Sequence, residues 1–237
     1  MTGGKARPKG RYAVYFAPEP GSALARFGAA WLGYDVAAGA AVPQPAVAAI
    51  GRTRLHAITA EPRRYGFHAT LKPPFFLADG CDPDTLGDTV AALAEGVAAF
   101  AAPPLCLSRI SGFLALTLSA PCPAMHELAD RCVGALDRFR APPSPAERKR
   151  RRRTGLTPRQ DVLLARWGYP YVMAEFRFHM TLTARLDAAE GMAVSEALAP
   201  LVAPLCRAPL AVDAVSLFHQ PGGDAPFRLL RRYRLAG

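Results

Sequence analysis

Short β-prone runs and amphipathic helical patterns alternate along the chain. Strands are predicted where β-branched and aromatic residues gather between turn-forming residues. These runs cover residues 11–16, 65–71, 105–119 (two strands, or one with a bulge), 176–186, and a C-terminal pair at 211–219 and 227–235 that is typical of a hairpin.

Helices are predicted where apolar residues recur every three or four positions behind a capping residue or a proline. They begin at Ser22, at Asp82 or Asp84, at Pro123, at Thr157 and at Asp187. Because the strands cluster in pairs and threes between helices, the pattern favours an α+β fold over a regularly alternating parallel sheet.

The composition indicates one globular unit. Of 237 residues, 51% are hydrophobic and 20% are charged, which is enough apolar material for a core. Residues 1–10 are expected to form a flexible tail and residues 11–237 a single domain. No apolar run reaches membrane-spanning length, the N-terminus has no apolar signal core, and the five cysteines include no C-x-x-C pair. We therefore expect a monomeric cytoplasmic protein with reduced thiols and no membrane association.

The net positive charge of the chain indicates an anionic partner. The chain has 29 Lys and Arg against 19 Asp and Glu, a net charge of +10. Six consecutive cations, Arg148–Arg153, lie in a segment predicted to be a mobile, solvated loop at about residues 141–156. The alternative is a flap that attracts a phosphorylated substrate or contacts an RNA backbone.

A short internal repeat is the most informative feature. Phe-His-Ala-Thr-Leu at residues 67–71 and Phe-His-Met-Thr-Leu at residues 178–182 agree at four of five positions. Side chains alternate between the faces of a strand, so His68 and Thr70 share one polar face in the first copy, and His179 and Thr181 share one in the second. Lys72 and Arg177 extend these faces with a cation.

This combination of side chains suits an anion that needs proton transfer. Histidine donates or accepts a proton near neutral pH, a threonine hydroxyl can bind a phosphoryl oxygen, and a cation offsets negative charge. Two facing strands would present both histidines to one phosphorus, one to activate water and one to protonate the leaving oxygen. The arrangement requires no metal, and two imidazoles without a neighbouring carboxylate disfavour zinc.

Structural interpretations stand beside the catalytic one. A single H-x-T is more often a structural strand histidine, and the second copy is what favours catalysis. Lys72 and Arg177 would either contact the phosphate or lie solvated at the rim of the site. Tyr15, on the first strand, would stack on or hydrogen-bond a ligand, or be a core aromatic residue.

The paired motif resembles the two-histidine (2H) phosphoesterase superfamily, and the segments at residues 11–16, 65–75 and 156–182 are similar to its bacterial branch associated with phosphonate metabolism. The resemblance implies a bilobal α+β fold with pseudo-two-fold duplicated antiparallel sheets flanked by helices and an active cleft between the lobes. It implies that His68 and His179 are the acid–base pair and that Thr70 and Thr181 bind phosphoryl oxygens. Which histidine is the acid stays open.

The expected function is therefore a hydrolase that needs no metal or cofactor and opens a cyclic phosphodiester or related small phosphoester, linked to phosphonate metabolism. One alternative is a phosphodiesterase or ligase acting on RNA ends. RNA is not favoured, because no aromatic-basic alternation supports readout of bases. Another alternative is a non-catalytic module that binds a phosphorylated ligand.

Overall fold

The computed structural model describes residues 10–153 and 155–237, so the predicted N-terminal tail lies outside the described residues except for Gly10. The strands of the described part are β1 (Arg11–Phe16), β2 (Tyr34–Asp35), β3 (Ala40–Ala41), β4 (Ala69–Phe75), β5 (Phe100–Ala102), β6 (Leu105–Ile110), β7 (Phe113–Leu118), β8 (Met180–Thr181), β9 (Leu210–Val212), β10 (Ala214–Gln220) and β11 (Arg228–Arg234). The α-helices are α1 (Ala23–Leu32), α2 (Arg52–Ile58), α3 (Ala60–Arg63), α4 (Pro83–Glu95), α5 (Pro123–Ala135), α6 (Pro145–Arg152), α7 (Pro158–Trp167) and α8 (Ala188–Val202). Three short 3-10 helices are η1 (Asp137–Phe139), η2 (Met173–Glu175) and η3 (Ala203–Cys206).

One large antiparallel sheet organises the fold, which confirms the predicted α+β class. Its strand order is β11-β10-β1-β4-β8-β7-β6. Two halves, β11-β10-β1-β4 and β8-β7-β6, meet where β4 pairs with β8 through Ala69 opposite Met180. The sheets expected of the two lobes are thus joined edge to edge, and the two H-x-T segments lie side by side at the junction.

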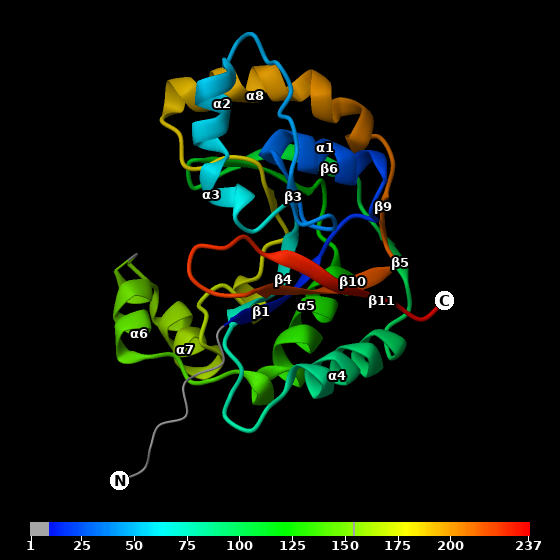
Figure 1. Ribbon diagram of the computed structural model, residues 1–237, viewed down its shortest axis with the longest axis vertical. Coiled ribbons are helices and arrows are strands. Elements are labelled where there is room, and N and C mark those ends of the chain that lie inside the picture. The colour runs from blue at the N-terminus through cyan, green and yellow to red at the C-terminus, as the bar shows by residue number, and fades with distance from the viewer. Residues whose placement is uncertain (1–9, 154) are drawn as a thin grey trace.

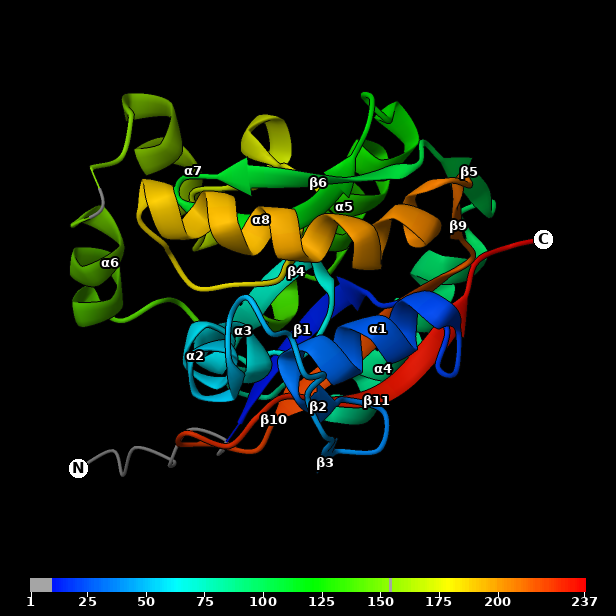
Figure 2. The same cartoon turned by 90° about the horizontal axis from the view of Figure 1, so that it is seen from above.

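Different helices cover the two halves of the sheet. Helix α5 packs against β4, α4 packs against β10 and β11, and α8 packs against β6 and β7. Figure 1 shows α8 at one end of the molecule and α4 at the other, and Figure 2 shows α8 lying along β6. Buried residues of both halves, among them Val14, Leu71, Leu116 and Met180, belong to one hydrophobic core.

Helix starts follow the capping residues of the sequence. The side chains of Ser22, Asp82, Thr157 and Asp187 each accept a hydrogen bond from a backbone N–H in the first turn of α1, α4, α7 and α8. These bonds satisfy donors that a helix N-terminus otherwise leaves unpaired. The predicted helix starts are therefore confirmed, including that of α5 behind Pro123.

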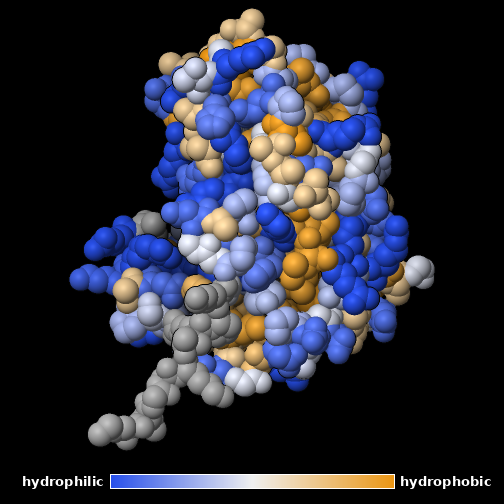
Figure 3. All heavy atoms as spheres, viewed as in Figure 1, coloured by the Kyte–Doolittle hydropathy of each residue, from blue (hydrophilic) through white to orange (hydrophobic). Residues whose placement is uncertain are grey.

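The basic segment is a helix where a loop was predicted. Ser144 accepts from the backbone N–H of Glu147, the Glu147 carboxylate accepts from the backbone N–H of Ser144, and Pro145 holds the first helical position. This capping box starts α6, which carries most of the six-cation run. The prediction was wrong because α6 has no buried residue, so no apolar periodicity marks it. Figure 3 shows hydrophilic side chains over this side of the molecule.

The two motif strands also differ from their predicted extents. Strand β4 continues through Pro73 and Pro74 to Phe75, although these prolines were expected to end it. Strand β8 has two residues instead of the eleven predicted. Beyond β8, the backbone N–H groups of Leu182 and Thr183 still donate to the Leu114 carbonyl. Side chains add to these bonds, because Thr183 Oγ1 accepts from the backbone N–H of Leu114 and Trp31 Nε1 donates to the Leu182 carbonyl.

Helix α8 with η3 is long and apolar enough, by length and composition, to cross a membrane. Its buried residues include Val194, Leu198 and Val202, which belong to the hydrophobic core, and the helix packs against β6 and β7. Packing on the second half of the sheet thus accounts for these buried positions, whereas Met192 and Leu201 of the same helix are exposed.

Candidate active site

The four side chains of the two H-x-T motifs form one quartet on the sheet. Ala69 and Met180 are paired and fully buried. Their neighbours on each strand point to the opposite face, where antiparallel register sets His68 beside Thr181 and Thr70 beside His179. The two histidines occupy diagonal corners, and such diagonal neighbours are about 7–8 Å apart.

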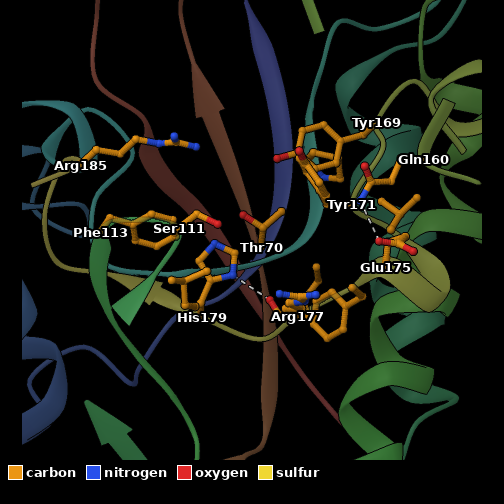
Figure 4. A pocket seen from close by; sticks show the side chains of 15 residues that line it. Thr70, Ser111, Phe113, Gln160, Tyr169, Tyr171, Glu175, Arg177, His179 and Arg185 are labelled. Carbon is orange, nitrogen blue, oxygen red and sulfur yellow. Dashed lines mark hydrogen bonds between the residues drawn. The ribbon is translucent and has the colours of Figure 1, made fainter. Parts of the chain in front are cut away.

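This face opens into a cleft. A cavity of about 680 Å³ is lined by all four residues of the quartet. A second cavity, of about 440 Å³, shares Thr70, Phe113, His179 and other residues with it and extends toward α7 and η2. Figure 4 shows the Thr70 hydroxyl and the His179 ring facing each other at the centre, with Arg185 reaching in from one side and Tyr169 and Tyr171 lying on the other. The quartet thus lies where a ligand can reach it.

Each histidine is oriented by the carbonyl oxygen two residues before it. His68 Nδ1 lies 2.9 Å from the Gly66 oxygen, and His179 Nδ1 lies 2.7 Å from the Arg177 oxygen. A carbonyl only accepts, so both Nδ1 atoms carry hydrogen and Nε2 is the atom left to exchange a proton. His68 Nε2 is 3.2 Å from Thr70 Oγ1 and accepts from this hydroxyl.

Burial lowers the pKa of both imidazoles. Burial, opposed by the Gly66 hydrogen bond and assisted by the nearby His179, lowers the pKa of His68 to about 4. Burial also lowers the pKa of His179, with the Arg177 carbonyl opposing it. The Tyr15 ring stacks on His68 with ring centroids 3.7 Å apart, which shields one face of the imidazole from water. Tyr15 is fully buried, which agrees with its interpretation as a core aromatic residue, and it also lines the larger cavity.

The two predicted cations have different positions. Arg177 is exposed and lines the smaller cavity next to His179. Lys72 points to the face of the sheet opposite the quartet, so its predicted place beside the phosphate was wrong. Its ammonium donates to the Val133 carbonyl on α5 at 2.9 Å and lies 3.7 Å from Asp137 Oδ1. The cause is a bulge, since Thr70 pairs with Tyr15 whereas Lys72 pairs with Val14, one residue out of register. The expected alternation therefore breaks between Thr70 and Lys72.

Several cleft residues were not predicted from the sequence. Arg185 lines both cavities, and the period-two alternation from Arg177 through His179 and Thr181 would have reached it. Arg11, Arg150 and Arg151 line the larger cavity from β1 and α6. Arg150 and Arg151 belong to the cation run for which a flap that attracts a phosphorylated substrate was the alternative interpretation. No local pattern pointed to Arg11, because only the tertiary fold brings the start of β1 to the cleft. Among the described residues, no group of three or more His, Cys, Asp or Glu gathers to hold a metal ion.

Comparison with known proteins identifies the family. Residues 70–228, about two thirds of the chain, match the family described as "Protein of unknown function (DUF1045)". The chain belongs to the DUF1045 family. The matched part of this DUF1045 chain contains Thr70, His179 and Thr181, and His68 lies two residues before it.

Two curated relatives carry a kinase name. The chain is 38% identical over 231 residues to "Ribose 1,5-bisphosphate phosphokinase PhnN" of Janthinobacterium sp. (strain Marseille), covering 96% of this chain and 51% of the relative. It is 37% identical over 223 residues to the protein of the same name from Laribacter hongkongensis (strain HLHK9), covering 93% of this chain and 51% of the relative. The DUF1045 chain therefore spans about half the length of these relatives.

Among solved structures, the chain is similar to E. coli LigT complexed with 3′-AMP. The identity is 14% and the TM-score 0.45, with 96% of this chain and 99% of that chain covered. At this TM-score, the likeness carries no argument about the site, which rests on the geometry of the quartet.

Proposed function

We propose that this protein is a metal-independent phosphoesterase that hydrolyses a cyclic phosphodiester or related small phosphoester with paired-histidine acid–base catalysis. The observation that carries the proposal is the quartet: two imidazoles and two hydroxyls that share one face of paired strands in a cleft. Their resemblance to the 2H phosphoesterase motifs adds to this argument.

The quartet supplies each part of a hydrolysis. One histidine takes a proton from water through Nε2, the ring nitrogen that carries no hydrogen, as the water oxygen attacks phosphorus. The bond from phosphorus to the ester oxygen then breaks, and this oxygen takes the Nε2 proton of the other histidine, which enters the reaction as an imidazolium with hydrogen on both nitrogens. Thr70, Thr181 and Arg185 line the same cavity. The two hydroxyls would hydrogen-bond the phosphoryl oxygens, and the guanidinium would offset their negative charge.

We assign the base to His68 and the acid to His179. The base must be neutral before reaction, and His68, with its pKa near 4, its half-buried ring and its contact with Tyr15, is held neutral more strongly. His179 lies between the two cavities beside the exposed Arg177 and Arg185, where a bound phosphate would raise its pKa.

The names of the relatives suggest a ribose phosphate as the substrate. They describe a kinase for ribose 1,5-bisphosphate. The present 237 residues contain no G-x-x-x-x-G-K-[ST] loop for nucleotide phosphates. We therefore assign the kinase activity to the half of the relatives that this chain does not cover, and to this chain a preceding ring-opening step that yields a ribose phosphate. The name PhnN supports the proposed link to phosphonate metabolism.

The test measures turnover of nucleoside 2′,3′-cyclic phosphates and cyclic ribose phosphates in a metal-chelating buffer. Wild-type protein is expected to open at least one of them, and His68→Ala or His179→Ala to lower kcat by about 10²–10⁴-fold, as is typical for loss of a general acid or base. The matched control is His56→Ala, whose exposed side chain lies outside both cavities. An inactive wild-type protein on the whole panel, or full activity in both cleft variants, would contradict the proposal.

A further inference from the structure

A second group of cations lines the larger cavity away from the quartet. Arg11 at the start of β1 and Arg150 and Arg151 on α6 converge there with Tyr65 and Tyr169. With Arg185 beside His179, the cavity has four arginines and, among its described lining residues, one carboxylate, Glu61. Such an excess of positive charge in a concave site attracts anions strongly.

Arg11 and Arg151 are held in place by neighbouring side chains. Arg11 Nε and Nη2 donate to Gln220 Oε1 at 2.8 and 2.5 Å, and its guanidinium lies 5.5 Å from the centre of the Phe227 ring. The Arg151 guanidinium lies 4.8 Å from the centre of the Tyr169 ring. Guanidinium groups fixed in this way lose little conformational entropy when they bind an oxyanion.

The charges around Arg151 act on it in both directions. Burial lowers the pKa of Arg151; nearby Arg150 and Arg11 lower it further, whereas Tyr169 and Glu147 oppose the shift. A bound phosphate would add a negative charge beside these arginines and favour their charged forms.

The Tyr15 hydroxyl is an independent observation at the same place. Tyr15 is fully buried, and within the described part of the chain its hydroxyl has no hydrogen-bond partner. Its electrostatic neighbours are Tyr65, Arg11 and Tyr169, all of which line the cavity. A buried hydroxyl without a partner costs free energy, and an oxyanion held by Arg11 would accept its hydrogen.

We propose that Arg11, Arg150 and Arg151, with the Tyr15 hydroxyl, form a second anion subsite that binds a phosphate monoester of the same substrate whose cyclic ester reacts at the quartet. The inference rests on the proposed function for the identity of the reacting group. The Tyr15 ring stacks on His68, so the second subsite is one aromatic ring away from the quartet and within reach of one small molecule. The substrate class is therefore a phosphorylated sugar or nucleotide that carries two separate phosphates.

The geometry favours a small molecule over an RNA backbone. Other cations of the basic run have partners outside the cavity: Arg152 pairs with Asp161 at 2.6 Å, and Arg148 Nη1 donates to the Pro143 carbonyl at 2.7 Å. The run therefore does not present one continuous stripe of phosphate contacts, which an RNA strand would use. Only Arg150 and Arg151 of this run line the larger cavity.

Calorimetric binding to the whole protein tests the second subsite without requiring turnover. Ribose 1,5-bisphosphate is compared with ribose 5-phosphate and ribose 1-phosphate, and adenosine 3′,5′-bisphosphate with adenosine 3′-phosphate. At least one bisphosphate is expected to bind about tenfold or more tightly than its monophosphates, the gain typical of charge-assisted hydrogen bonds. The pair that shows this preference identifies the carrier as a sugar or a nucleotide.

The variants separate a built subsite from general attraction. Arg150→Ala/Arg151→Ala is expected to reduce the preference to about twofold or less, whereas Lys149→Ala/Arg153→Ala, which removes the same charge from the same helix outside the cavity, keeps it. Tyr15→Phe, which retains the ring on His68, is expected to weaken only the bisphosphate. If the double variant does not fold, Arg150→Ala alone, at an exposed position, takes its place in the same measurement.

Equal affinity for bisphosphates and monophosphates in the wild-type protein overturns the subsite. So does an equal loss in both double variants, or tighter binding of an RNA oligomer that depends on Lys149 and Arg153. Turnover without a bisphosphate preference would refute the subsite and leave the proposed function standing. A bisphosphate preference without turnover would refute the proposed function and leave the subsite standing.

Discussion

At the residue scale, the chemistry of each motif depends on one nitrogen atom. The Gly66 and Arg177 carbonyls hold the Nδ1 hydrogens, and this leaves both Nε2 atoms free for proton exchange. The motif repeats this contact with the same two-residue separation in both halves. The environments differ, because His68 stacks on a buried tyrosine and His179 lies at the junction of the two cavities. This difference separates two otherwise equivalent histidines.

The first prediction concerns the pH dependence of kcat/KM. The base must be neutral, so the rate should rise with pH as His68 loses its proton near pH 4. The acid must be protonated, so the rate should fall as pH passes the pKa of His179, which burial sets below the ordinary histidine value of about 6.5. The free enzyme should show a bell-shaped profile with its maximum on the acidic side of neutrality. Initial rates at low substrate between about pH 4 and pH 9 measure it, and a maximum above pH 8 would contradict the assignment.

At the element scale, β4 and the turn before it set which side chains reach the cleft. Gly66 has φ +72° in this turn, and its carbonyl binds His68. The bulge between β1 and β4 then turns Lys72 toward α5. A two-residue strand, β8, is enough for the second motif because side chains and loops continue its hydrogen bonding. Small backbone irregularities thus define the boundary of the site.

The second prediction tests the position of Lys72. Lys72→Met keeps most of the length of the unbranched side chain and removes a charge that faces Val133 and Asp137, away from the cleft. Turnover is expected to stay within about twofold of wild type, while Lys72→Ala should lower the free energy of unfolding by about 2–5 kcal/mol through the cavity it leaves. Steady-state kinetics and urea denaturation measure these effects. A large loss of kcat in a folded Lys72→Met protein would contradict this position and indicate that the ammonium acts in the cleft.

The third prediction concerns Gly66. An added Cβ would lie 1.8 Å from Val36 Cγ1, at a backbone conformation that already disfavours side chains. Gly66→Ala is expected to cost about 1–3 kcal/mol of stability and to lower kcat, because the carbonyl that orients His68 must move. Gly80→Ala is the control, since Gly80 has φ +80° with nothing within 4 Å of the added Cβ. It should lose about 1–2 kcal/mol through the left-handed backbone alone, less than Gly66→Ala, whose added Cβ also meets Val36, and it should keep its activity. Equal effects of the two substitutions would contradict the role of Gly66.

At the scale of the whole molecule, the site exists because the two halves of the sheet join. The quartet takes one histidine and one threonine from each half, and a single core runs beneath the junction. The arginines of α6 and β1 extend the cleft on one side. Part of the net charge of +10 is therefore concentrated in the larger cavity, which is lined by four arginines.

The fourth prediction concerns Met180 at this junction. Met180 is fully buried between the two halves, so Met180→Ala should lower stability by about 2–5 kcal/mol, in a single cooperative transition. Activity should fall at temperatures where the protein is still folded, because the two motifs lose their common support. Met192→Ala, on the exposed face of α8, should change neither property. Calorimetry and kinetics measure both, and two separate unfolding transitions would show that the halves are independent.

The sequence by itself determined the elements with local causes. Capping residues such as Ser22, Asp82 and Thr157 start their helices because the bonds they make lie within one turn. Likewise, strand alternation placed each histidine with its threonine on one polar face, and the repeat indicated two such strands.

Only the tertiary structure decided what depends on contacts distant in sequence. The pairing of Ala69 with Met180 makes one quartet of two motifs 111 residues apart, and the pairing of β1 with β4 produces the bulge that turns Lys72 away. The packing of α6 beside the cleft brings Arg150 and Arg151 of the cation run into the lining of the larger cavity. Local patterns carry no information on these contacts, because the free energy that selects them comes from burial and pairing between segments far apart in the chain.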